Sequence, residues 1–469
     1  MYNNICQENL IVKNQSETTR RKFLKGTAAA VTIPMFMPNS VFGANNKINL
    51  AWVGFKNQGG GDLHSCQHGN NVVALCDVND HVLQGKGKQF KKAKLYKDFR
   101  KMLDEMDKEI EAVGVGTPDH VHFAITYKAM KMNKHVFVEK PLVHSLKECR
   151  TLQELAKEKK DLVTQMGNQG HAFEEAMLIK EWYDGGLIGE VKEVLAWTNR
   201  PKNGWGFPGH PGGGHKEYAE AQEVPKHLDW ELWRGAVAKD IKYNHTYALS
   251  RQGCWRPWWD FGCGGLGDIG CHTIDAPWWA LGMGAPEAVE VEMKYEANPI
   301  YTPNGSIVTY KFPGKNGKPG HSIKWLEAPS RPTAPEGYDD KVWGVGGMIM
   351  PGTKGGICHP DMRPNGARLY PKGKWQEYRS DKSKQVPKTL RRPGSIHRDW
   401  IEGIRNSRKS CSDFSYACPL TEVILLGTLA IRTGKGFKWN SEKMEITGND
   451  EAAKMIDIPA RKGWRVEDL

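Results

Sequence analysis

Five short apolar runs alternate with amphipathic segments between residues 47 and 166, and this pattern constrains the fold of the 469-residue chain more than any other feature. The apolar runs occupy residues 48–53, 72–76, 111–115, 135–138 and 161–165. The helical patterns occupy residues 79–92, 98–106, 120–133 and 146–159. Ser145 and Glu148 have capping-box spacing, which marks the start of the last helix. Unbroken apolar runs are typical of strands buried on both faces of a parallel sheet, so the sequence predicts a doubly wound α/β domain.

The turn after the first run carries glycines expected of a dinucleotide site. It reads Gly54-Phe55-Lys56-Asn57-Gln58-Gly59-Gly60-Gly61. The first and third glycines of G-x-G-x-x-G are present, but Lys56 stands at the second, which normally lets the backbone approach the pyrophosphate. Lys56 therefore either turns outward or places its ammonium on the phosphates. A glycine loop that binds no nucleotide is the alternative.

Asp77 closes the second run, about 20 residues after the glycine turn, where an acid accepts hydrogen bonds from the adenosine ribose. A carboxylate here repels a 2′-phosphate, so the sequence predicts NAD. Lys56 and Asn79 soften this preference and leave NADP open. The alternative is that Asp77 is only a turn residue.

The first 44 residues have the pattern of an export signal. Arg20 and Arg21 precede a weakly apolar segment that ends at residue 37, which is typical of a Tat signal. An amphipathic helix is the alternative, but two prolines would break it. We expect a signal at 1–44, cleaved near Gly43 or Ala44, and a periplasmic or secreted protein that crosses the membrane folded. A protein exported in this way can carry a tightly held cofactor.

Composition excludes several classes of protein. The ten Cys lack paired C-x-x-C spacing, which argues against a disulfide scaffold or a zinc ribbon, and we expect buried, unpaired thiols. The net charge of +12 is diffuse, whereas nucleic-acid binding needs a focused basic face. No unbroken apolar stretch is long enough to predict a membrane span. No metal site is predicted, because His210 and His215 in a glycine loop are weak evidence for one.

Several sequence motifs directly follow the predicted parallel strands, and others lie later in the chain. They are Thr117-Pro118-Asp119-His120-Val121-His122, Glu139-Lys140-Pro141, Gln165-Met166-Gly167-Asn168-Gln169-Gly170, Gly189-Glu190-Val191 and Gly264-Gly265-Leu266-Gly267-Asp268-Ile269-Gly270-Cys271-His272. Together they resemble the Gfo/Idh/MocA oxidoreductases, and most closely the secreted, Tat-exported members. The resemblance covers almost the whole chain after the signal, with insertions between Pro201 and Gly262 and between Ala328 and Gly352.

The position of Glu139-Lys140-Pro141 at the end of a predicted strand indicates a chemical role for Lys140. A lysine at the carboxyl end of a parallel strand faces the ligand crevice, and desolvation beside a cationic nicotinamide lowers its pKa. It can then stabilise an alkoxide or relay a proton. The resemblance implies that Lys140 is the catalytic lysine. The alternative is an exposed lysine in a loop.

Asp268 and His272 are four residues apart, so a helical turn projects them from one face. The resemblance places this pair opposite the nicotinamide, with His272 as the general base and Asp268 on a neighbouring hydroxyl. The alternative is a buried histidine of the core. The full set of residues expected at the cofactor is Gly54, Lys56, Asn57, Gln58, Gly59, Asp77, Thr117, Pro118, His120, His122, Glu139, Lys140 and Asn168.

Longer alternating strands follow at 190–198, 286–296, 305–312 and 320–327, with helices at 272–281, 396–406 and 418–432. They predict an N-terminal Rossmann NAD-binding domain at 45–166 and an α+β domain at 167–469 with a large, mostly antiparallel open sheet. The C-terminal helices are expected to pack back on the Rossmann domain. The resemblance implies that the open face packs on a second subunit, in a homo-dimer or homo-tetramer.

Residues 197–279 hold nine of the 17 Trp. Indole faces stack on sugar rings, so this insert suggests a carbohydrate ligand, although Trp also fills cores. The residues expected at the substrate are Trp205, Trp255, Arg256, Trp258, Asp268 and His272. Lys216 and Tyr218 are further candidates.

The leading hypothesis is an NAD-dependent oxidoreductase that converts a CH–OH group of a sugar or glycoside to a ketone, with Lys140 and His272 as the acid/base pair. A redox-neutral, NAD-dependent glycoside hydrolase that keeps its cofactor is an alternative, because free NAD is scarce outside the cytoplasm. A second alternative is a non-catalytic periplasmic protein that binds sugar or NAD. Lys56, which replaces the second glycine of the dinucleotide fingerprint, is the residue that favours this alternative.

Overall fold

A computed structural model describes residues 47–200, 217–250, 253–303, 305–314, 317, 319–343 and 346–469. The chain divides into two compact units, Met1–Asn45 and Asn46–Leu469, and every described residue belongs to the second. The predicted export signal at 1–44 lies outside the described residues.

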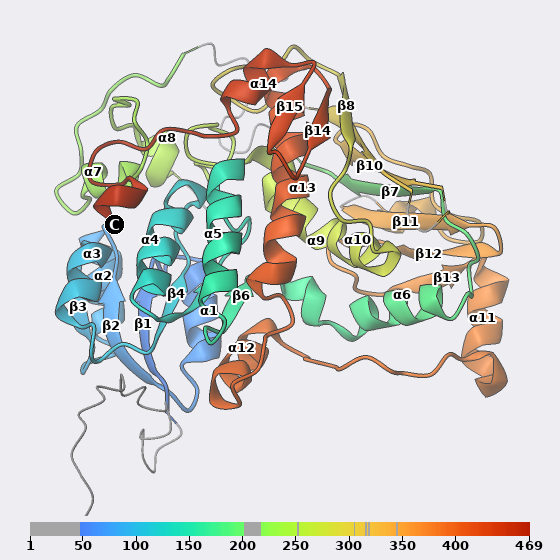
Figure 1. Cartoon of the computed structure of the whole chain (residues 1–469), viewed down its shortest axis with the longest axis horizontal. Helices are drawn as coiled ribbons and strands as arrows, with labels where there is room; N and C mark the ends of the chain where they lie inside the picture. Colours follow the sequence, from blue (N-terminus) through green and yellow to red (C-terminus); the bar gives the residue numbers. More distant parts are fainter. Residues whose placement is uncertain are drawn as a thin grey trace, which may run out of the picture. The chain divides into compact units, whose positions relative to one another are not determined.

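Six parallel strands form one sheet in the order β3-β2-β1-β4-β5-β6 (Figure 1). The strands are β1 Asn49–Val53, β2 Asn71–Cys76, β3 Lys94–Tyr96, β4 Ala112–Val115, β5 His135–Val138 and β6 Thr164–Met166. This is the strand order of doubly wound dinucleotide-binding domains, so the predicted fold of this half is confirmed. The short edge strand β3 was not predicted, because Lys94-Leu95-Tyr96 forms no apolar run.

Helices cover both faces of this sheet. They are α1 Gln58–Cys66, α2 Asp80–Gly87, α3 Phe99–Glu105, α4 Asp119–Lys131, α5 Leu146–Glu158 and, from the end of the chain, α12 Ile396–Arg405. Successive strand residues point to opposite faces. Ala51 and Val53 join the core formed with α3, α4 and α5, whereas Leu50 and Trp52 join the core formed with α1 and α12.

The capping box predicted for the last of these helices is confirmed. Glu148 N donates to Ser145 Oγ at 3.2 Å, and Ser145 N donates to Glu148 Oε2 at 2.9 Å.

A second sheet of nine strands has the order β13-β12-β11-β7-β10-β9-β8-β14-β15. The strands are β7 Glu193–Thr198, β8 Ala288–Met293, β9 Ser306–Phe312, β10 His321–Glu327, β11 Gly346–Gly352, β12 Gly355–His359, β13 Arg368–Tyr370, β14 Phe437–Asn440 and β15 Glu445–Thr447. β7 and β10 are parallel and the other neighbours antiparallel, which confirms the predicted mostly antiparallel sheet. The glycine-rich strand β11 and the four short strands β12–β15 were not predicted.

The remaining helices are α6 Glu174–Asp184, α7 Trp230–Arg234, α8 His245–Ala248, α9 Cys271–Thr273, α10 Asp275–Leu281, α11 Lys372–Ser380, α13 Phe414–Thr433 and α14 Asp450–Lys454. α13 contacts α5 and β6, and α12 contacts α1, so C-terminal helices complete the Rossmann half (Figure 1). α13 is long and apolar enough to cross a membrane, but 83% of its apolar window is buried inside the protein, as in a core helix.

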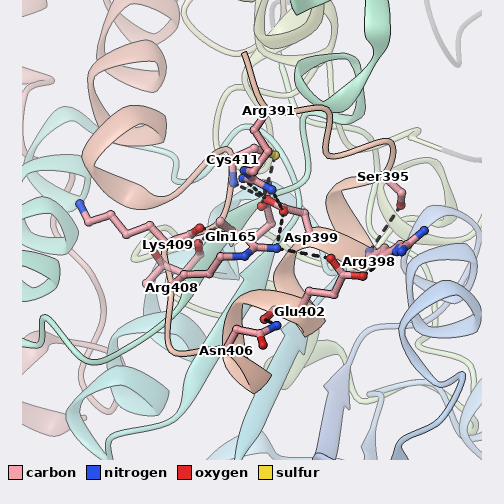
Figure 2. A network of polar contacts seen from close by, with 12 residues as sticks. Gln165, Arg391, Ser395, Arg398, Asp399, Glu402, Asn406, Arg408, Lys409 and Cys411 are labelled. Atoms are coloured by element: carbon pink, nitrogen blue, oxygen red, sulfur yellow. Dashed lines mark hydrogen bonds and ion pairs between the residues drawn. The ribbon is translucent and has the colours of Figure 1, made fainter. Parts of the chain in front are cut away.

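Ionic contacts join α12 to the segments that precede and follow it (Figure 2). The buried Asp399 carboxylate pairs with Arg391 and, at 2.8 Å, with Arg408, and it accepts a hydrogen bond from Cys411 N at 2.6 Å. Burial alone would raise the pKa of Asp399, but Arg391 and these other donors hold it below its usual range. A paired buried carboxylate of this kind fixes the start of α12, from which His397 reaches Asp62 at 2.8 Å.

Part of one face of the large sheet is covered by the chain itself, whereas the sequence predicted an open face for a second subunit. Trp343 is buried against Trp197 and Leu326, in a cluster that includes Ile349 and Cys358. Its segment belongs to the insertion between Ala328 and Gly352, so the chain itself covers part of this face.

The nine cysteines of the described residues form no disulfide. Eight are buried and Cys411 is half-buried. Their packing matches the expectation of buried, unpaired thiols.

Candidate functional site

A cleft of about 170 Å³ opens at the carboxyl ends of β1, β2 and β4. Ten of the residues predicted to bind the cofactor line it: Gly54, Lys56, Asn57, Gln58, Gly59, Asp77, Thr117, Pro118, Glu139 and Lys140. Doubly wound sheets bind their ligands at this edge, where the strand order reverses.

The glycine turn brings three backbone segments into close contact at the cleft. A Cβ on Gly54, which has φ of +74°, would lie 2.6 Å from Thr117 Cγ2, and a Cβ on Gly59 would lie 2.3 Å from Gly54 O. Both positions therefore require glycine for packing, as the first and third glycines of the fingerprint do. The turn leads directly into α1, whose N-terminal N–H groups suit a pyrophosphate.

Lys56 and Asp77 lie on the same side of the cleft. Burial raises the pKa of the Asp77 carboxyl to about 6. The N–H groups of Asn79 and Phe55 and the Lys56 ammonium lower this pKa, but their effect is smaller than that of burial. Phe55 N donates to Asp77 Oδ2 at 3.4 Å and Asn79 N donates to Oδ1 at 2.9 Å. These bonds hold the carboxylate where the ribose hydroxyls of a dinucleotide would reach it.

This geometry predicts that Asp77→Ala shifts the preference from NAD toward NADP. Loss of the carboxylate removes its repulsion of a 2′-phosphate, and Lys56 stays in place to attract one. We expect the ratio of NADPH to NADH dissociation constants to fall at least about tenfold, measured by nucleotide fluorescence titration. Asp104→Ala on α3, where Asp104 pairs with Lys128 at 2.8 Å, is the matched control. An unchanged ratio in Asp77→Ala would contradict the assignment.

His120 and His122 do not line the cleft, contrary to the role expected for them. His120 places its ring nitrogens 3.2 Å from Phe261 O and 2.9 Å from Trp233 O. His122 places its ring nitrogens 2.9 Å from Pro141 O and 2.8 Å from Thr117 O. Burial lowers the pKa of both to about 4. The two imidazoles therefore join the Rossmann half to the insert and to the Lys140 loop.

The aromatic insert is mainly a core of its own. Trp258, expected at the substrate, is fully buried among Tyr247, Phe261 and Tyr301. Trp255 lines the cleft instead, with the Arg256 guanidinium 4.4 Å from its ring centroid. Trp205, His210, His215 and Lys216 lie outside the described residues. Among the described residues, no group of three His, Cys, Asp or Glu side chains is arranged to hold a metal ion.

This insert covers the cleft from the side of Asp77. Asp229 N donates to Val78 O at 3.0 Å, and Asp80 N donates to His227 O at 2.7 Å, directly after β2. The side chains that line the cleft from beyond the Rossmann core are Leu228, Leu232, Trp233, Ala248, Leu249, Trp255, Arg256 and Trp464. A nucleotide in the cleft would therefore have protein on both of its sides.

At the inner end of the cleft, Lys140 meets the second half of the chain. Its Nζ donates to Asp268 Oδ1 and to Asp268 O, both at 2.9 Å, and both side chains are buried. Asp268 also pairs with Arg200 and with Arg256 Nε at 3.2 Å. Asp268 lies in a π-helical turn, Leu266–Gly270, that leads into α9 with His272. Such turns are frequent at functional sites.

The electrostatics of this site favour a neutral histidine and let the lysine titrate near neutral pH. Burial, helped by the Arg256 guanidinium, lowers the pKa of Lys140 to about 7. Burial lowers the pKa of His272 well below its usual range, and Lys140, Arg363, Arg256 and Arg200 add to the effect. Protonating His272 is therefore costly, whereas Lys140 can change charge near neutral pH.

Several buried polar atoms here have no hydrogen-bond partner among the described residues. They are His272 Nδ1, Thr117 Oγ1, and both Oδ1 and Nδ2 of Asn168. Buried polar groups without partners are rare and indicate a missing ligand group. The carboxamide of a nicotinamide and the hydroxyls of a sugar supply such groups, so the site fits a dinucleotide and a polyhydroxy substrate.

Glu139 is buried next to Lys140 and lines the same cleft. Burial and the neighbouring Asp62 raise the pKa of Glu139, and a Cβ on Gly167 would lie 2.3 Å from Glu139 Oε1. Sequence reasoning missed Asp62, and it also missed Asp119, whose Oδ2 accepts from Cys263 N at 3.1 Å. Asp119 belongs to the Thr117-Pro118-Asp119 motif, so its place in the sequence could have indicated a role at the site. No sequence motif marks Asp62.

Two family models match the chain. The model described as "Oxidoreductase family, NAD-binding Rossmann fold" matches residues 47–166, and the model described as "Oxidoreductase family, C-terminal alpha/beta domain" matches residues 193–307. Both are Gfo/Idh/MocA models, and together they cover half of the chain.

Among curated relatives, an inositol 2-dehydrogenase/D-chiro-inositol 3-dehydrogenase of Lacticaseibacillus casei is 33% identical over 27% of this chain and 37% of its own length. A levoglucosan dehydrogenase of Pseudarthrobacter phenanthrenivorans is 25% identical over 25% of this chain and 29% of its own length. An uncharacterized oxidoreductase of Schizosaccharomyces pombe is 24% identical over 42% of each chain. The chain thus matches less than half of the length of these relatives.

Solved structures resemble almost the whole second unit. The WlbA dehydrogenase of Bordetella pertussis, solved with NADH and UDP-GlcNAcA, has 15% identity and a TM-score of 0.56 over 84% of this chain and 98% of its own. A levoglucosan dehydrogenase solved with NADH and L-sorbose has 15% identity and a TM-score of 0.54 over the same shares. At this identity the likeness shows the fold.

Proposed function

Because the chain belongs to the Gfo/Idh/MocA family of oxidoreductases, we propose that it oxidises a hydroxyl group of a sugar or polyol with NAD. The observation that carries this proposal is the meeting of Lys140, Asp268 and His272 in one buried site at the inner end of the cofactor cleft. The inositol and levoglucosan dehydrogenases among the relatives support the same class of substrate.

NAD in the cleft supplies the acceptor for the hydride that leaves the hydroxyl carbon. The chain's own residues handle the proton. Lys140, neutral above about pH 7, takes the hydroxyl proton on Nζ, and Asp268 at 2.9 Å holds the ammonium that results. His272 stays neutral and accepts a hydrogen bond from the substrate. The sequence analysis made His272 the base; here Lys140 takes that role, because burial, together with the four cations nearby, opposes protonation of His272.

The direct test uses the purified full chain loaded with NAD. We expect reduced nicotinamide to appear when a sugar or polyol from a panel that includes myo-inositol and levoglucosan is added. A protein that binds NAD but reduces none of it across the panel, while still binding a sugar, would instead be the non-catalytic binding protein.

A second candidate function is favoured by the insert over the cleft. Leu228 and Trp233 of the insert line the cleft beside Trp464 of the C-terminal segment, and a cofactor retained there would be reoxidised in place. The alternative is then a redox-neutral hydrolase of glycosides. Mass spectrometry after gel filtration and denaturation would reveal a retained nucleotide. Net glycoside cleavage with solvent deuterium entering the sugar would favour this alternative, and oxidised sugar as the product would exclude it.

We further propose that the protein is exported to the periplasm or beyond through the twin arginines Arg20 and Arg21. The buried, unpaired cysteines support folding before export. Cell fractionation with Arg20→Lys/Arg21→Lys as the comparison tests this proposal. The homo-dimer or homo-tetramer stays a prediction. The molar mass of the purified protein, measured by light scattering, would test it.

A further inference from the structure

A second, polar cavity of about 400 Å³ lies beside the Lys140 site and is not explained by a cofactor. Its lining is Gln58, Gln169, Phe173, Arg363, Asn365, Gly394, Ser395, Ile396 and His397. These residues supply amides, one hydroxyl and one aromatic side chain, which suit the hydroxyl groups and apolar face of a sugar. No carboxylate belongs to the lining.

Hydrogen bonds connect this cavity to the catalytic motif. Arg363 Nη2 donates to Gln169 Oε1 at 3.2 Å, and Gln169 Nε2 donates to Glu139 Oε1 at 3.5 Å. Gln169 follows Asn168, whose side-chain amide has no hydrogen-bond partner among the described residues, and Glu139 precedes Lys140. The cavity therefore adjoins the place where a substrate hydroxyl would meet Lys140.

Arg363 is held in position next to His272. Thr273 Oγ1 donates to Met362 O at 2.8 Å, which ties the residue before Arg363 to the residue after His272. A Cβ on Gly170 would lie 2.8 Å from Pro364 Cδ, so the chain on the other side of Arg363 packs closely as well. The guanidinium is thus presented by a rigid segment.

The charge of Arg363 is not balanced by a nearby carboxylate. Among the described residues, no Asp or Glu oxygen lies within 4.0 Å of its guanidinium nitrogens. Asp268 is already shared by Lys140, Arg200 and Arg256. His397, the other lining group that can carry charge, contacts Asp62 at 2.8 Å. Arg200 and Arg256 therefore have carboxylate partners whereas Arg363 has none among the described residues, and an oxidised nicotinamide would add a further positive charge.

We propose that this cavity binds the carboxylate of a sugar acid, with the Arg363 guanidinium as its partner and the hydroxyl to be oxidised at Lys140. A planar guanidinium matches a carboxylate with two parallel hydrogen bonds, and a single cation suits a single negative charge. The inference rests on the proposed function and narrows its substrate to an anionic sugar.

The test compares acids with neutral sugars of the same stereochemistry on the NAD-loaded full chain. Dissociation constants are measured by calorimetry for D-glucuronate against D-glucose and for D-galacturonate against D-galactose, with D-glucose 6-phosphate as a third arm. In at least one pair the acid should bind at least about tenfold more tightly, and added salt should weaken it. If no acid outcompetes its neutral partner, or the phosphate binds more tightly than the acids, the proposal is overturned.

Variants assign the preference to Arg363. Arg363→Gln should bring the ratio of the neutral-sugar to the acid dissociation constant close to one, and Arg363→Lys should retain part of the preference for the acid. Arg379→Gln on α11, where Arg379 lies over Trp375, is the matched control and should leave it intact. Melting temperatures verify folding. A protein that binds no NAD would refute the proposed function, whereas one that oxidises neutral sugars as well as acids would refute only this inference.

Discussion

Replacing Lys140 by Met is expected to slow hydride transfer to NAD about 10³-fold, with little change in the dissociation constant for NAD. Met fills the space of the lysine stem but cannot take the hydroxyl proton, and the Asp268 carboxylate then loses one of its three cations. The measurement is the steady-state rate of nicotinamide reduction beside a nucleotide titration of the same samples.

Two further variants show whether the effect belongs to the reacting site. Lys128→Met removes a lysine of α4 that pairs with Asp104 at 2.8 Å and does not line the cleft, and it should leave the rate unchanged. His272→Asn should cost less than Lys140→Met, because the proposal gives His272 a hydrogen bond and not the proton. Equal rates in wild type and Lys140→Met would remove Lys140 from the mechanism.

Oxidation by the wild type should lose about 50-fold in kcat/KM between pH 7 and pH 5, because the neutral fraction of Lys140 falls from about one half to about 1%. The sign follows from the proton transfer. Lys140 must be neutral to accept the hydroxyl proton, and its pKa of about 7, lowered by burial and Arg256, keeps it neutral only above that pH. The reverse reduction needs the ammonium, so its rate should fall as pH rises above 7.

The comparison with Lys140→Met isolates this titration. Residual activity of the variant should lack the slope between pH 5 and 7. A wild-type slope that persists unchanged in the variant would mean that another group titrates, and Asp119, whose pKa is raised to about 6 chiefly by burial, is the neighbour to examine.

The Rossmann half could be predicted from the sequence because its signals are local. Buried parallel strands are short apolar runs, and the Gly54 turn and the Ser145 cap each lie within a few residues. The edge strand β3 carried no such signal, since Lys94-Leu95-Tyr96 forms no apolar run and pairs with β2 alone. In the second half, β11 and β12 pair through glycine-rich segments that no hydrophobic pattern marks.

The site was predictable in part, for a similar reason. Lys140 and His272 stand in motifs, so their residue types were informative on their own. The cationic surroundings were not, because Arg200 and Arg363 come from segments far from both motifs in the sequence. The tryptophans led to a wrong prediction, because Trp258 was expected at the substrate but packs on Tyr247 and Tyr301 in a core. Composition alone cannot distinguish a tryptophan-rich core from a sugar-binding surface.

The central claim is that a substrate hydroxyl lies between Lys140 and His272 beside the nicotinamide ring. The most direct test is a crystal structure of the full chain with NADH and a sugar that the enzyme oxidises. Our account predicts the hydroxyl oxygen about 3 Å from Lys140 Nζ and within hydrogen-bond reach of the His272 imidazole. A sugar bound elsewhere, with Lys140 still paired to Asp268 and out of reach of every hydroxyl, would contradict it.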